Sequence, residues 1–188
     1  MAGGTAPHAG QAGTFIRELG ARSKGGPCRI YTADMRIGVA GERSFAYPDV
    51  SGMCVERQFR DETRDVLLNP SFVIEVLSPS TEAYDRGRKL AIYMAVPSIV
   101  KIVLVSQDQV RVDKYVATRR HLALRRDRRI ARRACVLSRS AARSCSRISS
   151  TAWNSRRCRR CGNTVRVPPG IPAKWIVAAL RSALMPRL

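Results

Sequence analysis

The chain has 188 residues and a formal net charge of +20, from 34 Lys and Arg against 14 Asp and Glu. This length suffices for one domain with a real hydrophobic core. The sequence has no run of about 18 apolar residues and no apolar signal segment at its start, so membrane insertion and export are not supported and a cytoplasmic protein is expected.

The positive charge is concentrated in the last third of the chain. Residues 1–116 hold 15 Lys and Arg against 13 acids, whereas residues 117–188 hold 19 against a single acid, Asp127. In this last part Arg, Ser, Ala and Cys follow one another in irregular order, and such a composition cannot offset the entropy cost of ordering. We therefore predict a domain over residues 1–116 and a mostly disordered basic tail over residues 117–188.

The predicted domain begins with a helix and a hairpin. Residues 8–24 place several apolar side chains on one helical face. These are Ala12, Phe15, Ile16 and Leu19. Residues 28–37 alternate like a half-buried strand, and residues 44–55 read as its hairpin partner, with Pro48 indicating an edge or a bulge. The polar stretch 56–65 is expected to be a surface loop.

A buried strand and a second helix follow. Residues 72–78, FVIEVLS, are apolar except for Glu75, which is the pattern of a strand buried on both faces. Ser80 or Thr81 can cap a helix that runs to about Met94. The strand therefore carries one charge that must be compensated.

A last hairpin is predicted from residues 99–106 and 110–116, which flank a turn. The expected order is helix, strand, strand, strand, helix, strand, strand. We therefore expect an α/β fold of the α+β kind with a mixed sheet. In the tail, only residues 173–185 have the pattern of an amphipathic helix.

Glu75 is the most informative residue, because a carboxylate on a buried strand is costly unless it is paired or bound to a cation. Asp49, in the segment YPDV of the preceding strand, supplies a second carboxylate. Two such oxygen ligands on neighbouring strands suit Mg²⁺ or Mn²⁺, with water and substrate phosphate completing the coordination. A metal bound there can activate a water and stabilise a phosphodiester under attack. The residues therefore predict phosphodiester hydrolysis.

Asp85, Lys89 and Tyr93 share one face of the following helix, and Lys89 is a candidate to orient the attacking water or to neutralise the phosphate. Simpler interpretations remain for each residue. In the simpler interpretation, Asp85 and Lys89 are only an exposed ion pair, worth roughly 0.3 to 0.5 kcal/mol. The corresponding alternative for Glu75 is a pair with a nearby arginine. For Asp49 it is a turn or bulge residue after proline.

Four segments together carry a family resemblance. They are GGPCRIYTADMRI, YPDV, LLNPSFVIEVLSPSTEAYDRGRKLAIYMAVPSI and VLVSQDQVRVDKY. Over about residues 1–116 the chain resembles the Uma-two family of endonucleases, whose domain is restriction-endonuclease-like, of the PD-(D/E)xK type. The resemblance implies a divalent-metal-dependent nuclease that acts on DNA, with a homodimer as one option for its assembly and no membrane partner.

The resemblance also implies roles for individual residues. Asp49 takes the first acidic position and Glu75 the second, which makes both metal ligands, and Lys89 takes the catalytic lysine displaced onto the following helix. The usual lysine position, two residues after the second acid, is Leu77 here. Family members usually carry Tyr where Ile102 stands.

The two ends of the chain depart from the family pattern. The family has a helix and a strand before the start of this sequence, and a glycine-tryptophan turn with further strands after Tyr115. We therefore expect a domain too shortened at both ends to be fully active. A shift of reading frame in a GC-rich gene is our hypothesis for the tail, because such codons read out of frame favour Arg, Ala, Ser, Pro, Gly and Cys.

The tail admits two other interpretations. A structural zinc site would use the Cys158-Arg-Arg-Cys161 pair and two more ligands, Cys135 and Cys145, whose spacing is not that of a zinc knuckle. Alternatively, the protein is a non-enzymatic nucleic-acid-binding protein that contacts phosphates through its arginines.

The remaining cysteines and the histidines belong to no evident motif. Cys28 and Cys54 lie in apolar, strand-like segments, and no disulfide framework is evident. His8 and His121 stand alone in the sequence and are read as incidental residues rather than ligands.

Overall fold

The computed structural model describes most of the first two thirds of the chain. The described residues are 5–41, 43–108 and 111–117, with the backbone of β9 (Leu122–Arg126), β10 (Ser155–Arg157) and β11 (Thr164–Arg166). The zinc interpretation, the helix over 173–185, His121 and most of the tail lie outside these residues. Within the part described, no helix is both long and apolar enough to cross a membrane.

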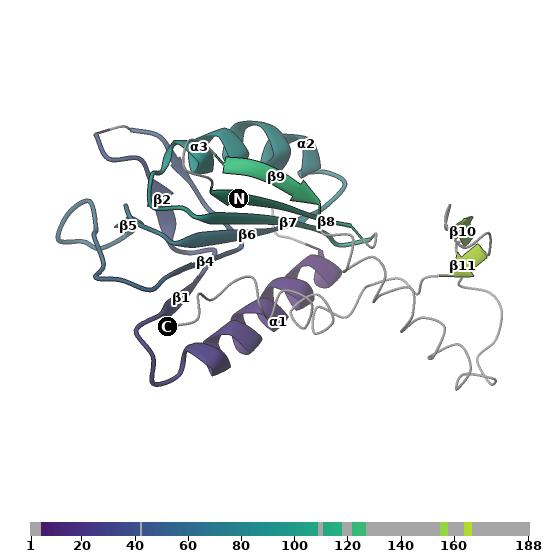
Figure 1. Ribbon diagram of the computed structural model, residues 1–188, viewed down its shortest axis with the longest axis horizontal. Helices are drawn as coiled ribbons and strands as arrows, with labels where there is room; N and C mark the ends of the chain where they lie inside the picture. The colour runs from purple at the N-terminus through teal and green to yellow at the C-terminus, as the bar shows by residue number, and fades with distance from the viewer. Residues whose placement is uncertain are drawn as a thin grey trace.

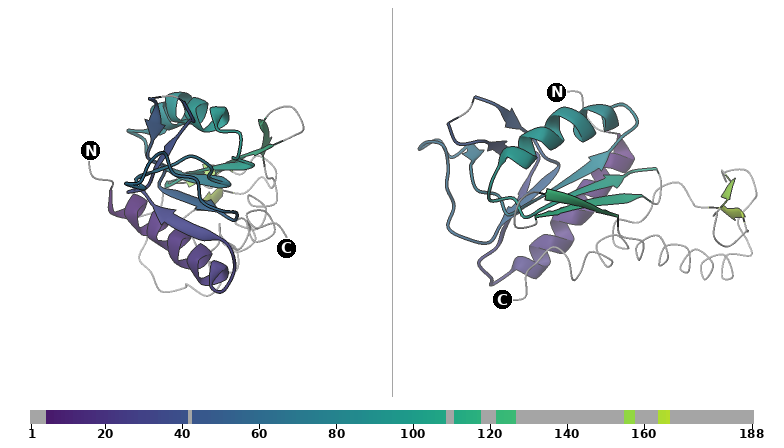
Figure 2. Two further views of the ribbon diagram at one scale, coloured as in Figure 1. Left: turned by 90° about the vertical axis from the view of Figure 1, so that its left-hand side faces the viewer. Right: turned by 45° about the horizontal axis from the view of Figure 1, so that its top comes forward.

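The centre of the molecule is a mixed six-stranded sheet (Figure 1). In spatial order its strands are β1 (Arg29–Thr32), β4 (Val50–Met53), β6 (Phe72–Leu77), β7 (Lys101–Ser106), β8 (Val112–Ala117) and β9. β6 and β7 are parallel, and the other neighbours are antiparallel. Helices cover both faces of the sheet (Figure 2), so the predicted fold class is confirmed.

The predicted first hairpin is present but broken in the middle. Each of its strands is split, into β1 and β2 (Arg36–Gly38) on one side and β3 (Phe45–Ala46) and β4 on the other. β1 pairs with β4, whereas β2 pairs with β3 and with β5 (Val66–Leu67) in a separate three-stranded sheet. Pro48 and Asp49 lie at the break, which confirms the irregularity that Pro48 predicts.

The first helix, α1 (Ala6–Ser23), covers one face of the sheet. Its predicted apolar face is confirmed: Phe15 and Leu19 are buried in a cluster with side chains of β4, β6, β7 and β8. From β6 this cluster takes Phe72, Ile74 and Val76. Because side chains alternate along a strand, the side chain of Glu75 lies on the opposite face.

That opposite face is covered by the second helical segment, which has three parts. They are α2 (Glu82–Tyr84), the π-helical turn η1 (Asp85–Lys89) and α3 (Leu90–Ala95). The helix is therefore confirmed, but the π-helical turn is not predicted by the apolar spacing. Thr81 stands at the predicted cap position, but it makes no side-chain capping hydrogen bond, and its hydroxyl lies 2.9 Å from Ser78 Oγ.

The sheet continues beyond the last predicted hairpin. β7 and β8 pair as expected, and β9 adds an antiparallel strand next to β8. β10 and β11 form a two-stranded sheet of their own. These three strands, with β5, are not predicted from the sequence, because they are short and carry weak apolar alternation.

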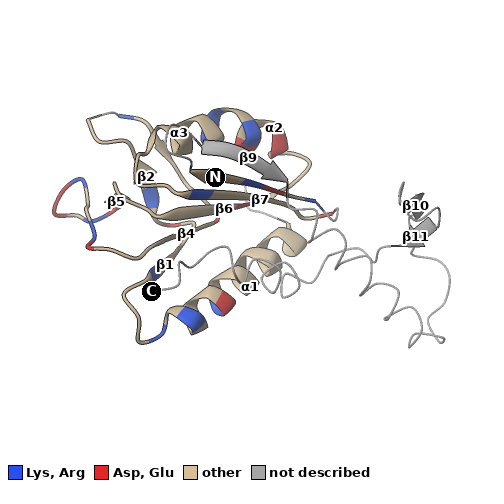
Figure 3. Cartoon of the chain, in the orientation of Figure 1, with Lys and Arg blue, Asp and Glu red and all other residues tan. Residues whose placement is uncertain are grey.

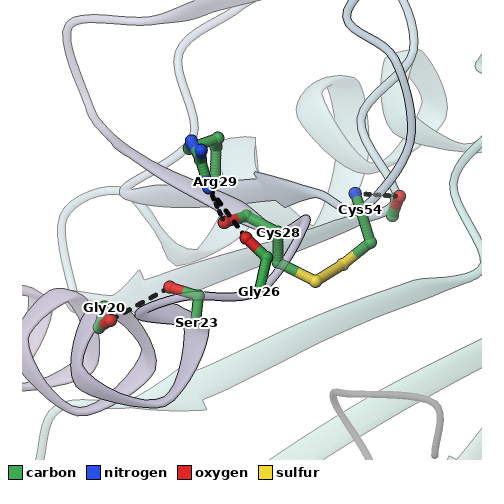
Figure 4. The surroundings of a disulfide bond; sticks show 7 residues. Gly20, Ser23, Gly26, Cys28, Arg29 and Cys54 are labelled. Atoms are coloured by element: carbon green, nitrogen blue, oxygen red, sulfur yellow. Dashed lines mark hydrogen bonds between the residues drawn. A yellow bond between two sulfur atoms is a disulfide. The ribbon is translucent and has the colours of Figure 1, made fainter. Parts of the chain in front are cut away.

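Cys28 and Cys54 form a disulfide bond, although no disulfide framework is evident from the sequence (Figure 4). The physical reason is the register of the hairpin. Arg29 pairs with Met53 in this antiparallel hairpin, so Cys28, just before Arg29, faces Cys54, just after Met53. Twenty-six positions separate the two cysteines in the sequence, a spacing that follows no recognisable motif.

Candidate active site

Asp49 and Glu75 lie side by side at the break in the hairpin. Val50, the first residue of β4, pairs with Ile74 of the antiparallel β6. Asp49, just before Val50, therefore lies opposite Glu75, just after Ile74. The Asp49 backbone N–H donates to Glu75 Oε2 over 3.3 Å. The Val76 N–H donates to Asp49 Oδ2 over 2.7 Å. The sheet therefore brings together the two carboxylates that the sequence singles out.

Glu75 is fully buried and is surrounded by donors. Lys89 Nζ lies 2.9 Å from each of its carboxylate oxygens. The hydroxyl of Tyr93 donates to Oε1. The alternative that Glu75 pairs with an arginine is therefore wrong, because the neighbouring cation is a lysine from the turn η1.

Asp85 joins the same group of charges. Its Oδ1 lies 3.2 Å from Lys89 Nζ, and the side chains of Asp85 and Lys89 are only 6% and 13% exposed. The alternative of an exposed helix pair is therefore wrong. The π-helical turn that carries both residues is a type of irregularity often found at functional sites. Acidic and basic residues lie close together on this helical segment (Figure 3).

Burial and neighbouring charges give the two carboxyl groups different pKa values. Burial and the nearby Asp49 raise the pKa of Glu75 to about 8, although Lys89 and Tyr93 act in the opposite direction. Burial also opposes ionisation of Asp49, but hydrogen bonds from His8 and Val76 outweigh it and lower the Asp49 pKa. For Lys89, burial is outweighed by the adjacent carboxylates, so its pKa is raised and it stays charged.

His8 belongs to this site, which corrects the expectation that it is incidental. Its Nε2 lies 3.2 Å from Asp49 Oδ2. The hydrogen bond to Asp49 raises the His8 pKa, despite the opposing effect of burial. Gln11, one turn further along α1, donates to the Gln107 carbonyl over 3.0 Å and fixes this end of the helix beside β7. No local sequence pattern predicts this contact, because it depends on how α1 crosses the sheet.

Leu77 and Ile102 show how the departures from the family pattern are accommodated. Leu77, at the usual lysine position, is buried in the apolar cluster between β6 and α3. Ile102 is fully buried in the same cluster. The positive charge at this site therefore comes from the helix, as the resemblance implies.

The donor set fits a hard divalent cation with few protein ligands. Across the described residues no group of three His, Cys, Asp or Glu side chains could hold a metal ion. Asp49 and Glu75 instead supply two adjacent carboxylates, and Mg²⁺ is commonly bound by one or two carboxylates with water and phosphate in its remaining positions. Lys89 lies against the same carboxylate and competes with such a cation.

A model of the Uma2 family, described as "Putative restriction endonuclease", matches residues 1–138. The chain belongs to the Uma2 family. This match extends past residue 116 and includes β9, which continues the sheet. The resemblance seen in the sequence is confirmed.

Two relatives of this Uma2 chain come from Synechocystis sp. (strain ATCC 27184 / PCC 6803 / Kazusa). "Uncharacterized protein slr1290" is 42% identical over 91 residues, which are 48% of this chain and 47% of that protein. "Uncharacterized protein sll1609" is 35% identical over 86 residues, 46% of this chain and 49% of that protein. The matched segment thus spans about half the length of each curated relative.

A solved structure shares the fold of the Uma2 chain. It is titled as a "putative nuclease belonging to DUF820" from Anabaena variabilis ATCC 29413. The TM-score is 0.53 at 16% sequence identity, over 66% of this chain and 69% of that chain. At this identity the likeness concerns the fold alone, and it agrees with the predicted α+β fold with a mixed sheet.

Proposed function

We propose that this protein is a Mg²⁺-dependent endonuclease that hydrolyses phosphodiester bonds in DNA, with Mn²⁺ as an alternative cofactor. The observation that carries the proposal is the meeting of Asp49, Glu75 and Lys89 at one point of the sheet. Family membership supports the same reaction class. The three residues come from separate parts of the chain: Asp49 precedes β4, Glu75 lies in β6 and Lys89 lies in η1.

Each residue has a distinct task in this proposal. Asp49, held ionised by its hydrogen bonds, and Glu75 would bind the cation. A divalent cation at this place would lower the pKa of a bound water and offset the charge that develops on the phosphate. Lys89 holds a positive charge within 2.9 Å of Glu75 and can orient the water or the scissile phosphate. His8, from α1, would hold Asp49 in place through the contact of its Nε2 with Asp49 Oδ2.

A nicking assay on supercoiled plasmid DNA tests the proposal. We expect cleavage by the full chain with Mg²⁺, none with EDTA, and a loss of at least about 100-fold in Asp49→Asn and Glu75→Gln, since each removes a metal ligand. Asp34→Asn is the matched control, because Asp34 is an exposed acid that bonds only locally, to Thr32. Cleavage that survives both ligand substitutions contradicts the proposal.

A further inference from the structure

Tyr93 is a buried tyrosine whose hydroxyl is committed to a single carboxylate oxygen. Its side chain is 0% exposed and packs in the apolar cluster between β6, β7 and α3. Side chains of this cluster include Val73, Leu77, Leu90 and Leu104. A phenol hydroxyl in such surroundings needs a hydrogen-bond partner, and here it donates to Glu75 Oε1.

The two oxygens of Glu75 are therefore in different positions. Oε1 accepts from the Tyr93 hydroxyl in the interior, whereas Oε2 accepts from the Asp49 backbone N–H. Oε2 is thus the oxygen on the side of Asp49. When one oxygen of a carboxylate is held by a hydrogen bond, the direction of the other oxygen is fixed as well. Two neighbouring carboxylates need such fixed directions to share one cation.

Lys89 and Tyr93 differ in how firmly they hold the carboxylate. Lys89 is 13% exposed and has a flexible four-carbon stem, so its ammonium can move aside when another cation approaches. The rigid ring of Tyr93 is held in place by the packing around it, so its hydroxyl cannot move away from Glu75. Tyr93 is therefore the donor that keeps Glu75 oriented with or without Lys89 against it.

We propose that Tyr93 is a positioning residue that fixes Glu75 Oε1 so that Oε2 is presented to a divalent cation shared with Asp49. The inference rests on the proposed function, since it assigns a role at the same site. It differs from a packing role, because it depends on one hydroxyl oxygen rather than on the volume of the ring.

The test is Mn²⁺ binding by the full-length Tyr93→Phe protein, measured by calorimetry together with the Tm and the Mn²⁺ dependence of nicking. We expect affinity for Mn²⁺ to fall about 10- to 100-fold, as is typical when a partner of a metal ligand is removed. The rate at saturating Mn²⁺ should recover most of the wild-type value, because the metal ligands themselves remain.

Two control variants separate positioning from packing. Tyr115→Phe removes a hydroxyl from a ring packed on the same cluster, and Ile102→Val loosens that cluster without touching the carboxylate. Both should leave Mn²⁺ affinity unchanged even where the Tm falls. If Tyr93→Phe does not fold, Tyr93→Met, which fills the space without a hydroxyl, is measured in the same way.

The outcomes distinguish this inference from the proposed function. A folded Tyr93 variant that binds Mn²⁺ as tightly as the wild type overturns the positioning role and leaves the nuclease proposal intact. A wild-type protein that binds no Mn²⁺ overturns both. A selective loss of affinity in the Tyr93 variant supports both.

Discussion

The backbone amide of Asp49 donates to the side chain of Glu75, so the two acids are joined by the sheet itself rather than by a loop. This contact arises at the break between β3 and β4, where the chain leaves the three-stranded sheet and enters the six-stranded one. A site built on strand ends is held more rigidly than one built on loops. Four consequences can be measured.

The first concerns Lys89. In Lys89→Met the buried Glu75 loses its neighbouring cation, so we expect the metal-free protein to lose about 2 kcal/mol of stability, of the order of a hydrogen bond to a charged group. Nicking should fall at least about 100-fold. Because Lys89 no longer competes for the carboxylate, the rise in Tm on adding Mg²⁺ should be larger than in the wild type. Thermal unfolding with and without Mg²⁺ checks this, and an unchanged metal-free Tm would count against the ion pair.

The second concerns pH. Glu75 has a folded-state pKa of about 8 against an ordinary value of 4.5, so its contribution to stability is complete below about pH 4.5 and is lost as the pH rises through about 8. The metal-free protein should therefore become less stable across this window, and Glu75→Gln should flatten the slope. Mg²⁺ affinity should rise over the same window, because the cation competes with the proton on Glu75. Affinity that is constant from pH 6 to pH 8.5 would contradict the assignment.

The third concerns His8. Replacing it in His8→Ala removes the side chain that holds Asp49, and a fall in nicking of about 10-fold is expected, as for other residues that orient a metal ligand. Thr14→Ala is the control, because the hydroxyl of Thr14, further along α1, donates to the Gly10 carbonyl within the same helix. Equal activity of the two variants would show that His8 is incidental after all.

The fourth concerns the close approach of β4 and β6. A Cβ on Gly52 would lie 2.4 Å from Phe72 Cζ, so Gly52→Ala should destabilise the protein by about 1–3 kcal/mol through overpacking. Gly13→Ala, in α1, meets nothing within 4 Å and should stabilise the helix by about 0.5–1 kcal/mol. Urea unfolding of the two variants gives the comparison, and a stable Gly52→Ala protein would contradict the packing described.

Much of the fold follows from patterns within single elements. Phe15 and Leu19 predict the buried face of α1, and the apolar run around Glu75 predicts a strand covered on both faces. The breaks within elements are harder to predict, because they depend on tertiary contacts. The split between β1 and β2 and the π-helical turn at Asp85 to Lys89 leave no signal in apolar spacing.

The candidate site shows the same division. Asp49, Glu75 and Lys89 can be chosen from the sequence because each carries a charge at an unusual place or matches a family motif. His8 and the Cys28–Cys54 bond cannot, because their partners are brought near by the crossing of α1 and by strand register. Tyr93 shares a helical face with Lys89 in the sequence, but its hydrogen bond to Glu75 requires the packing of α3 on β6.

The central claim is that Asp49 and Glu75 share one divalent cation, and titration calorimetry with Mn²⁺ tests it most directly. At pH 8 we expect one Mn²⁺ per chain in the wild type and in Asp34→Asn, and a loss of that binding in both Asp49→Asn and Glu75→Gln. Binding that is retained in full by both of these variants would contradict the claim.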